Sequence, residues 1–173
     1  MTNSNKRILG IDPGTRETGY AILNHAGLLD YGVKNFTDRA IRKNLLTDAQ
    51  KWLTRLIRFH RPKIIVIEKS NLTRLKSSRD LKFLIRKFAD IAKKRKVRVI
   101  ELSPLTVRKI LFNDGWGTKK EIAKFIAREH FSELQKFLKH NSKKWYQDYW
   151  SNMFDAVALA LAYRQKHKNN WVM

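Results

Sequence analysis

The sequence predicts an α/β fold in which a mixed five-stranded sheet carries helices on both faces. An almost fully apolar run, Ile8–Ile11, ends in Asp12, and a second run, Lys63–Glu68 (KIIVIE), is rich in β-branched residues and typical of a central strand. After three closely spaced strand-like segments, strands and helices alternate, which predicts a mixed sheet. The chain has 173 residues, enough for one full core, so we predict a single domain over residues 1–173.

The expected order of elements is β-β-β-α-β-α-β-α-α-α. Apolar runs bounded by turn residues predict strands over Lys6–Asp12, Gly19–Asn24, Leu28–Phe36, Lys63–Glu68 and Val97–Leu102. Apolar residues at helical spacing predict helices over Asp38–His60, Leu81–Lys96, Leu105–Phe112, Lys119–Leu134 and Asn152–His167. Arg61-Pro62 ends the first helix, NDGWG separates the third from the fourth, and the polar stretch Lys139–Lys144 predicts a loop before the last.

The charge of the chain indicates its partner. Lys and Arg number 37 against 15 Asp and Glu, a net charge of +22, and the pI is near 10.5. A small domain needs a net charge of only about 2–8 to stay soluble, so this excess of positive charge favours a polyanionic partner, most simply nucleic acid. A membrane surface fits less well, because the positive charge runs over the whole chain and is not gathered on one amphipathic helix.

Several residue types are missing or badly spaced for other functions. The chain has no cysteine, which removes disulfides, zinc fingers and thiol catalysis and fits a reducing compartment. No two of its five histidines are three or four residues apart, so no helical His–His metal pair exists. The longest apolar run, Ala156–Tyr163, is too short to span a bilayer, and the first five residues are polar. We expect a cytoplasmic, nucleoid-associated protein without membrane contact.

Three carboxylates stand where chemistry is expected. Asp12 and Glu68 each end an apolar strand, and ligands of such sheets bind beyond the carboxyl ends of strands. Asp155 lies in the apolar helix SNMFDAVALALAY, which we expect to pack on the sheet. Converging carboxylates need a cation, and oxygen ligands suit Mg²⁺ or Mn²⁺. Two such ions about 3.5–4 Å apart would support phosphodiester cleavage.

Each acid alone has a simpler explanation. Asp12 before Pro-Gly is common in turns, Glu68 is an ordinary charge at a strand end, and Asp155 is also suited to a helix N-terminal turn. The joint pattern on a strongly basic chain favours catalysis.

These motifs resemble the RuvC family of Holliday junction resolvases, within the RNase H-like superfamily. ILGIDPGTRETGY resembles the family's opening strand, IVIEKS its second acidic strand, DAVALALA its closing helix, and SPLTVRKILFNDGWGTKKEI its basic and glycine-containing segment. The resemblance spans Ile8–Tyr163 and implies an RNase H-like fold, Mg²⁺ or Mn²⁺, a homodimer, and paired symmetric nicks in four-way DNA junctions. It implies that Asp12, Glu68 and Asp155 are catalytic metal ligands and that Arg108 and Lys119 contact DNA near the scissile phosphate.

The sequence departs from the family at two positions. The residue three before the last acid is usually Asp or His, whereas here it is Asn152, which we include among the catalytic metal ligands through its carboxamide oxygen. Asp148 is the alternative for this role. Family members often carry an aromatic wedge three residues after the second acid, and here Asn71 takes that position.

Further residues suit DNA contact. Lys69–Lys96 holds eleven basic residues against Asp80 and Asp90, and a basic face beside the site would bind phosphates. We expect Lys69, Arg74 and Lys76 to bind DNA there. Trp116, between two glycines, suits stacking on a base and core packing equally. The aromatic cluster Trp145, Tyr146, Tyr149 and Trp150 favours core packing or a dimer contact over base contact.

Other functions stay open on the residues alone. A catalytically weak or inactive protein that binds branched DNA is compatible with Asn152, and a YqgF-like nuclease acting on RNA shares the Asp-Pro-Gly opening. A sugar-kinase or actin-like ATPase also places Asp and Gly after a first strand, but its two lobes need a longer chain.

Overall fold

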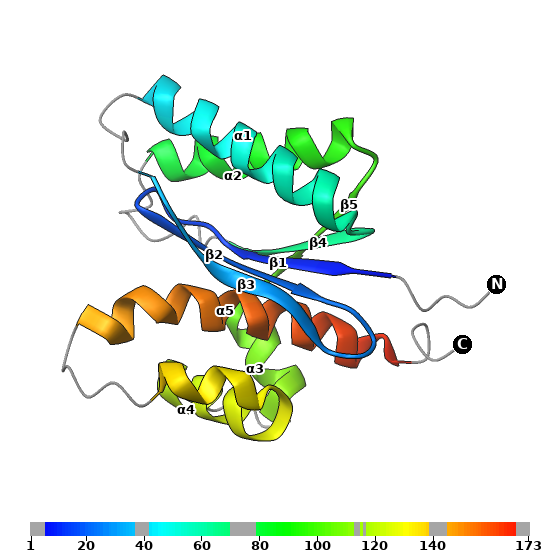
Figure 1. The fold of residues 1–173 in the computed structure, drawn as a ribbon, viewed down its shortest axis with the longest axis vertical. Helices are drawn as coiled ribbons and strands as arrows, with labels where there is room; N and C mark the ends of the chain where they lie inside the picture. Colours follow the sequence, from blue (N-terminus) through cyan, green and yellow to red (C-terminus); the bar gives the residue numbers. More distant parts are fainter. Residues whose placement is uncertain are drawn as a thin grey trace.

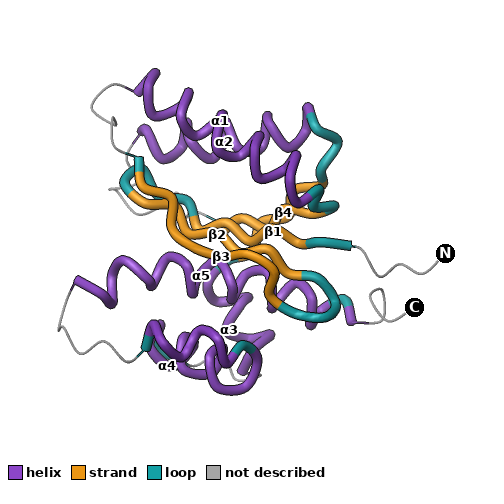
Figure 2. The backbone as a smooth tube through the Cα atoms, in the orientation of Figure 1, coloured by secondary structure: helices purple, strands orange, loops and turns teal. Residues whose placement is uncertain are grey.

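A computed structural model of the chain describes residues 6–36, 42–69, 79–112, 115, 117–138 and 145–168, with the side chains of residues 145–148 excepted. It consists of layers, with α1 and α2 on one face of a central sheet, α5 on the other, and α3 and α4 beyond α5 (Figures 1 and 2). The predicted five-stranded mixed sheet with helices on both faces is therefore confirmed. No helix in the described part of the chain is both long and apolar enough to cross a membrane.

The sheet has the strand order β3-β2-β1-β4-β5. Its strands are β1 Ile8–Asp12, β2 Glu17–Leu23, β3 Leu28–Asn35, β4 Ile64–Glu68 and β5 Arg98–Leu102. β1, β2 and β3 form an antiparallel meander, because two short connections join them, whereas β4 and β5 follow helices and run parallel to β1. The two solidly apolar strands, β1 and β4, are therefore neighbours at the centre of the sheet.

The described residues form five α-helices, of which α1 and α2 cover one face of the sheet and α5 the other. They are α1 Arg42–His60, α2 Arg79–Lys94, α3 Pro104–Phe112, α4 Lys119–Phe125 and α5 Trp145–Lys166. Alternation along β1 and β4 divides the core, because successive side chains in a strand point to opposite faces. Leu9, Ile11, Ile65 and Ile67 pack in the cluster under α1 and α2, while Ile8 and Val66 pack in the cluster around α5.

The last two predicted helices differ from the structure. The helix predicted over Lys119–Leu134 ends its α-helical part at Phe125, continues as a π-helical turn, Ile126–His130, and then as a 3₁₀ helix, Ser132–Phe137. Phe131, between these two turns, leaves helical geometry at φ −139° and ψ 84°. This change of direction buries both Phe131 and Leu134 in the core around α5.

Helix α5 begins at Trp145, seven residues before the predicted start. The aromatic residues expected ahead of the helix therefore belong to its first turns, where the Trp150 ring lies 4.3 Å from that of Phe137, centroid to centroid. Asp155 is accordingly in the interior of α5, and the interpretation of it as a residue of the first helical turn is wrong. The predicted loop Lys139–Lys144 lies outside the described residues.

Candidate active site

Asp12 and Glu68 lie at the same edge of the sheet. β1 and β4 are parallel, and Ile11 is in register with Ile67, so the two carboxylates follow the last paired residues of adjacent strands. By alternation both side chains belong to the face that carries Ile8 and Val66, which is the face toward α5.

Two glycines let α5 approach this face closely. A Cβ on Gly10 would lie 2.1 Å from the backbone oxygen of Ala156, and a Cβ on Gly19 would lie 1.8 Å from that of Asn152. Neither position can hold a side chain without a shift of the helix, because both contacts are with backbone. Gly19 is paired with Asp12 across β1 and β2, so the helix segment that carries Asp155 is held directly beside the strand end that carries Asp12.

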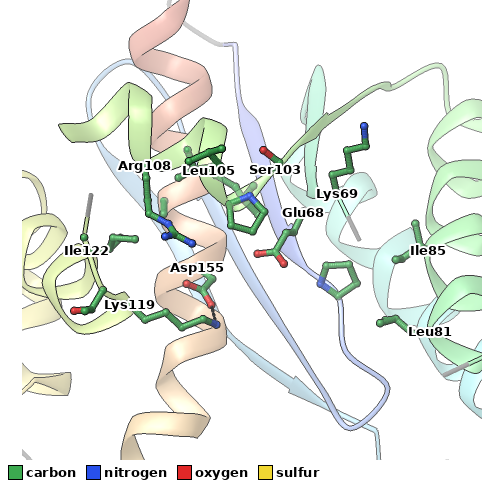
Figure 3. A pocket seen from close by; sticks show the side chains of 17 residues that line it. Glu68, Lys69, Leu81, Ile85, Ser103, Leu105, Arg108, Lys119, Ile122 and Asp155 are labelled. Carbon is green, nitrogen blue, oxygen red and sulfur yellow. Dashed lines mark hydrogen bonds and ion pairs between the residues drawn. The ribbon is translucent and has the colours of Figure 1, made fainter. Parts of the chain in front are cut away.

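A cavity of about 760 Å³ opens beside the acids. Figure 3 shows Glu68 from β4, Asp155 from α5, Arg108 from α3 and Lys119 from α4 pointing into one space. These four side chains line the cavity together with Lys69, Ser103, Leu105 and other residues of the same elements. The cavity is therefore acidic on the side of the sheet and α5, and basic on the side of α3 and α4.

The start of α4 fixes the position of Lys119. Gly117, at φ 137°, has a backbone conformation that residues with a side chain rarely adopt, and it leads into the N-cap Thr118. The Thr118 side chain accepts a hydrogen bond from the Glu121 backbone N–H, while Glu121 accepts one from the Thr118 N–H, which forms a complete capping box. Lys119 is then the first residue of the helix, and its ammonium donates to Oδ2 of Asp155.

Burial and repulsion shape the protonation of the acids. Desolvation raises the pKa of Asp12 well above its ordinary value, and the nearby Asp155 and Glu68 charges raise it further, against a smaller lowering by Lys119. Burial also raises the pKa of Asp155, although Lys119 and Arg108 act in the opposite direction. For Lys119, burial disfavours the ammonium, but the attraction of Asp155, Asp12 and Glu68 is greater and raises its pKa, so Lys119 stays charged.

The donor set fits a divalent cation. Burial, together with the repulsion of Asp155 and Glu68, raises the pKa of Asp12, and a bound cation would offset both effects. Oxygen ligands of this kind are those that Mg²⁺ and Mn²⁺ prefer. Among the described residues, no group of three Asp, Glu or His side chains lies close enough together to hold a metal ion without some movement of the side chains. The Lys119 ammonium contacts Asp155 instead.

The remaining predicted site residues divide into two groups. Lys69 lines the cavity, and Asn152 lies close to Asp12, because its backbone oxygen packs against Gly19. Arg74, Lys76, Trp116 and the wedge position Asn71 lie outside the described residues, as does the side chain of Asp148. Sequence reasoning missed the structural role of Gly10 and Gly19, although a glycine inside a strand is itself a signal of close backbone approach.

Comparison with known proteins gives a consistent result. The model of the family "Crossover junction endodeoxyribonuclease RuvC" matches residues 8–163. The crossover junction endodeoxyribonuclease RuvC of Helicobacter pylori (strain G27) is 28% identical over 181 residues, which covers 94% of this chain and 98% of that protein. The protein of the same name from Parasynechococcus marenigrum is 28% identical over 134 residues, or 71% of this chain and 82% of its own.

Solved structures share the fold. The Thermus thermophilus RuvC in complex with a Holliday junction substrate superposes with a TM-score of 0.74 at 18% identity, covering 95% of this chain and 96% of that one. The yeast mitochondrial Holliday junction resolvase Ydc2 superposes with a TM-score of 0.68 at 15% identity, covering 98% and 84%. The chain accordingly has the RNase H-like fold.

Proposed function

This chain belongs to the RuvC family of crossover junction endodeoxyribonucleases, and from that premise we propose that it resolves four-way DNA junctions by metal-dependent hydrolysis of the phosphodiester backbone. One observation carries the proposal. Glu68 at the end of β4 and Asp155 within α5 face the cationic side chains of α3 and α4, and Asp12 at the end of the neighbouring β1 is close enough to interact with the charges of both acids and of Lys119. We assign Asp12, Glu68 and Asp155 as the catalytic residues.

The basic side of the cavity suits a phosphate group. Lys119 stays protonated, and Arg108 lies close enough to Asp155 for its positive charge to oppose the rise in the pKa of that acid. Both side chains can pair with the oxygens of a scissile phosphate and stabilise the negative charge that grows in hydrolysis. In that reaction a water oxygen bonds to phosphorus, one bridging P–O bond breaks, and the leaving oxygen takes a proton. Lys69, at the rim beside Glu68, extends the cationic surface toward neighbouring phosphates.

Asp12, Glu68 and Asp155 would hold the divalent cation, with Asn152 as a further ligand through its carboxamide oxygen. When bound, Mg²⁺ or Mn²⁺ lowers the pKa of water and stabilises charge on the phosphate. The Lys119 ammonium donates a hydrogen bond to one carboxylate oxygen of Asp155, and a cation held by this acid would compete with it. The same lysine could pair with a phosphate, because its side chain is 69% exposed and only its ammonium group is engaged.

The proposal extends to a homodimer. A four-way junction presents two equivalent strands, so symmetric nicks need two active sites related by a twofold axis. Light scattering should detect a dimer, alone or on the junction. A monomer under both conditions would exclude paired cutting by one assembly.

The substrate test uses synthetic four-way junctions, linear duplexes and a hairpin RNA, each with Mg²⁺, with Mn²⁺ and with a chelator. We expect two symmetric nicks in the junction only when a divalent cation is present. Junction binding without cleavage under every condition would favour the inactive DNA-binding alternative. Preferential cleavage of RNA would favour the YqgF-like alternative.

A further inference from the structure

A second basic cavity lies at the end of the sheet opposite the acids. It has a volume of about 480 Å³, and its lining residues belong to the ends of α1 and α2 and to the residues just before β4 and β5. Figure 1 shows where these elements lie in the fold. We call it the amino-end pocket, and its lining is Ile57, Arg58, Arg61, Pro62, Lys63, Arg95, Lys96 and Val97. Five of these side chains are cationic and none is acidic.

The charges of the amino-end pocket lie at the C-terminal ends of α1 and α2, where the helix dipoles favour positive charge. All five basic residues are exposed, and none forms an ion pair with any residue in the described ranges. At the acidic site, by contrast, Lys119 is paired with Asp155. Five neighbouring positive charges repel one another, so the binding of an anion would lower the electrostatic free energy of the pocket.

The backbone of the pocket is also unusual. Arg61 at φ 48° and Lys96 at φ 57° are the positive-φ residues other than glycine in the described chain. Lys96 closes α2 in a Schellman arrangement, because its N–H donates to the Lys93 oxygen at 3.0 Å and the Val97 N–H donates to the Ala92 oxygen at 2.9 Å. Glycine is the residue normally favoured at this position, and a side chain costs about 1 kcal/mol there. Both helix ends thus carry a long cationic side chain where glycine would be more stable.

A basic strip on α1 continues the pocket. An adjoining cavity of about 580 Å³ shares Arg58 with it and is also lined by Lys51, Thr54, Arg55 and Phe59. Lys51, Arg55 and Arg58 are spaced by four and three residues, so they lie on one face of the helix. Phe59 beside them is 77% exposed. Cationic side chains next to an exposed aromatic ring are typical of a surface that binds nucleic acid.

We propose that the amino-end pocket and the strip on α1 bind the phosphates of a second DNA segment, so that one molecule holds two pieces of DNA. The five residues of β4 span about 17 Å, which separates this surface from the acids at the other strand end. On α1 alone, Lys51 to Arg58 extend about 10 Å, and each strand of a duplex presents a charge every 3.4 Å along its axis, about three phosphates in that length. An acidic peptide fits the pocket less well. Its apolar lining residues Ile57 and Val97 are buried, so they offer no exposed apolar surface to the side chains of a peptide.

The test uses the full chain bound to an immobilised four-way junction in a chelator, which prevents cleavage. A labelled linear duplex of 30 base pairs is added, and the retained label is measured against salt concentration. We expect wild type to retain the duplex and the double variant Arg61→Gly/Lys96→Gly to lose at least ten-fold in affinity. For this variant, the slope of log affinity against log salt concentration should be smaller in magnitude by about two, one for each lost phosphate contact.

The variants separate binding from folding and from cleavage. Glycine suits both left-handed positions, so the double variant should melt no lower than wild type and cut junctions at a rate within two-fold of it. The matched control Lys124→Ala/Arg128→Ala removes two exposed charges elsewhere and should retain the duplex. No capture by wild type, or equal capture by the glycine variant, would overturn the proposal. Capture of poly-glutamate in place of the duplex would also overturn it and would indicate an acidic protein partner.

Discussion

On the face of the sheet toward α1 and α2, β1 contributes Leu9 and Ile11, and both are fully buried. On the face toward α5, the same strand contributes Ile8 at its start and then Gly10 and Asp12. β4 repeats the difference at its carboxyl end, where Ile67 lies on the first face and Glu68 follows the buried Val66 on the second. The first face is filled with branched side chains along both strands, while the second has glycine in β1, which lets a helix come close, and carboxylates at the ends of both strands.

The difference shows how a short strand serves two purposes. Large apolar residues on the α1 and α2 face stabilise the fold by burying apolar surface, which contributes about 1.5–3 kcal/mol for each fully buried side chain. Gly10 contributes none of this, but its missing side chain admits the backbone of Ala156, the residue next to Asp155. Changes on the first face should therefore lower stability, and changes on the second should act on catalysis first.

The largest effect is expected from Asp12→Asn. This variant removes a carboxylate from the α5 face and leaves every basic residue in place, so cleavage should fall at least about 10³-fold while junction affinity stays within two-fold of wild type. Single-turnover cleavage and a mobility-shift assay measure the two quantities. Unchanged cleavage would contradict the site assignment, whereas loss of binding together with cleavage would indicate a general disturbance.

Gly19→Ala and Ile11→Ala test the two faces against each other. A methyl group on Gly19 would meet the Asn152 backbone, so we expect about 3 kcal/mol of destabilisation and a cleavage rate at least ten-fold lower in the folded protein. Ile11→Ala should also cost about 2–4 kcal/mol, because it leaves a cavity under α1 and α2. Its cleavage rate per folded molecule should nevertheless stay within two- to three-fold of wild type.

Urea unfolding gives the stability of both variants, and cleavage is compared below the unfolding transition. If Ile11→Ala reduces catalysis as much as Gly19→Ala does, the hypothesis that the α1 and α2 face serves stability while the α5 face serves catalysis is wrong.

The sequence predicted the features that local pattern determines. The continuous apolar runs of β1 and β4 predicted central strands, and because these strands are parallel neighbours, the acids at their ends lie at one edge of the sheet as expected. Contacts between distant segments were not predictable in this way. The close approach at Gly19 depends on where α5 crosses the sheet, and the pairing of Lys119 with Asp155 joins residues 36 apart in the sequence. The start of α5 was misplaced, because its first turns mix aromatic and polar residues and its packing partner, Phe137, belongs to another element.

A smaller effect concerns the pH dependence of stability without metal. The pKa of Asp12 is raised in the folded state, so folding favours the protonated carboxyl, and this contribution to stability is lost as pH rises through the folded pKa. At pH 7 in a chelator, Asp12→Asn should therefore melt higher than wild type, by about 2–4 °C for each kcal/mol. The difference should shrink toward pH 4, near the pKa of an unfolded aspartate.

Mg²⁺ supplies the control for this prediction. At pH 7 the cation should raise the melting temperature of wild type, because it binds the folded carboxylates, and it should do so much less for Asp12→Asn. A variant that melts below wild type at pH 7, or an equal response of both proteins to Mg²⁺, would show that Asp12 carries no buried charge in the metal-free protein.

The smallest effect is expected at Asn152, on the α5 face beside Gly19. Residues three apart in a helix lie near one another on its surface, so Asn152 and Asp155 can both reach the cation. A carboxamide ligand brings no negative charge, and we therefore expect wild type to need high Mg²⁺ and to work better with Mn²⁺, which accepts neutral ligands more readily. Asn152→Asp should lower the Mg²⁺ concentration for half-maximal cleavage by a few-fold.

Asp148→Asn is the matched comparison for Asn152→Asp, because it removes a charge from an earlier turn of the same helix. It should impair cleavage only if Asp148 supplies the ligand that Asn152 lacks. A metal titration separates the cases, since a ligand changes the Mg²⁺ requirement whereas a purely structural residue changes the maximal rate. If Asn152→Asp leaves the requirement at the wild-type value or raises it, Asn152 does not contact the metal, and the three acids on β1, β4 and α5 hold it without help from this position.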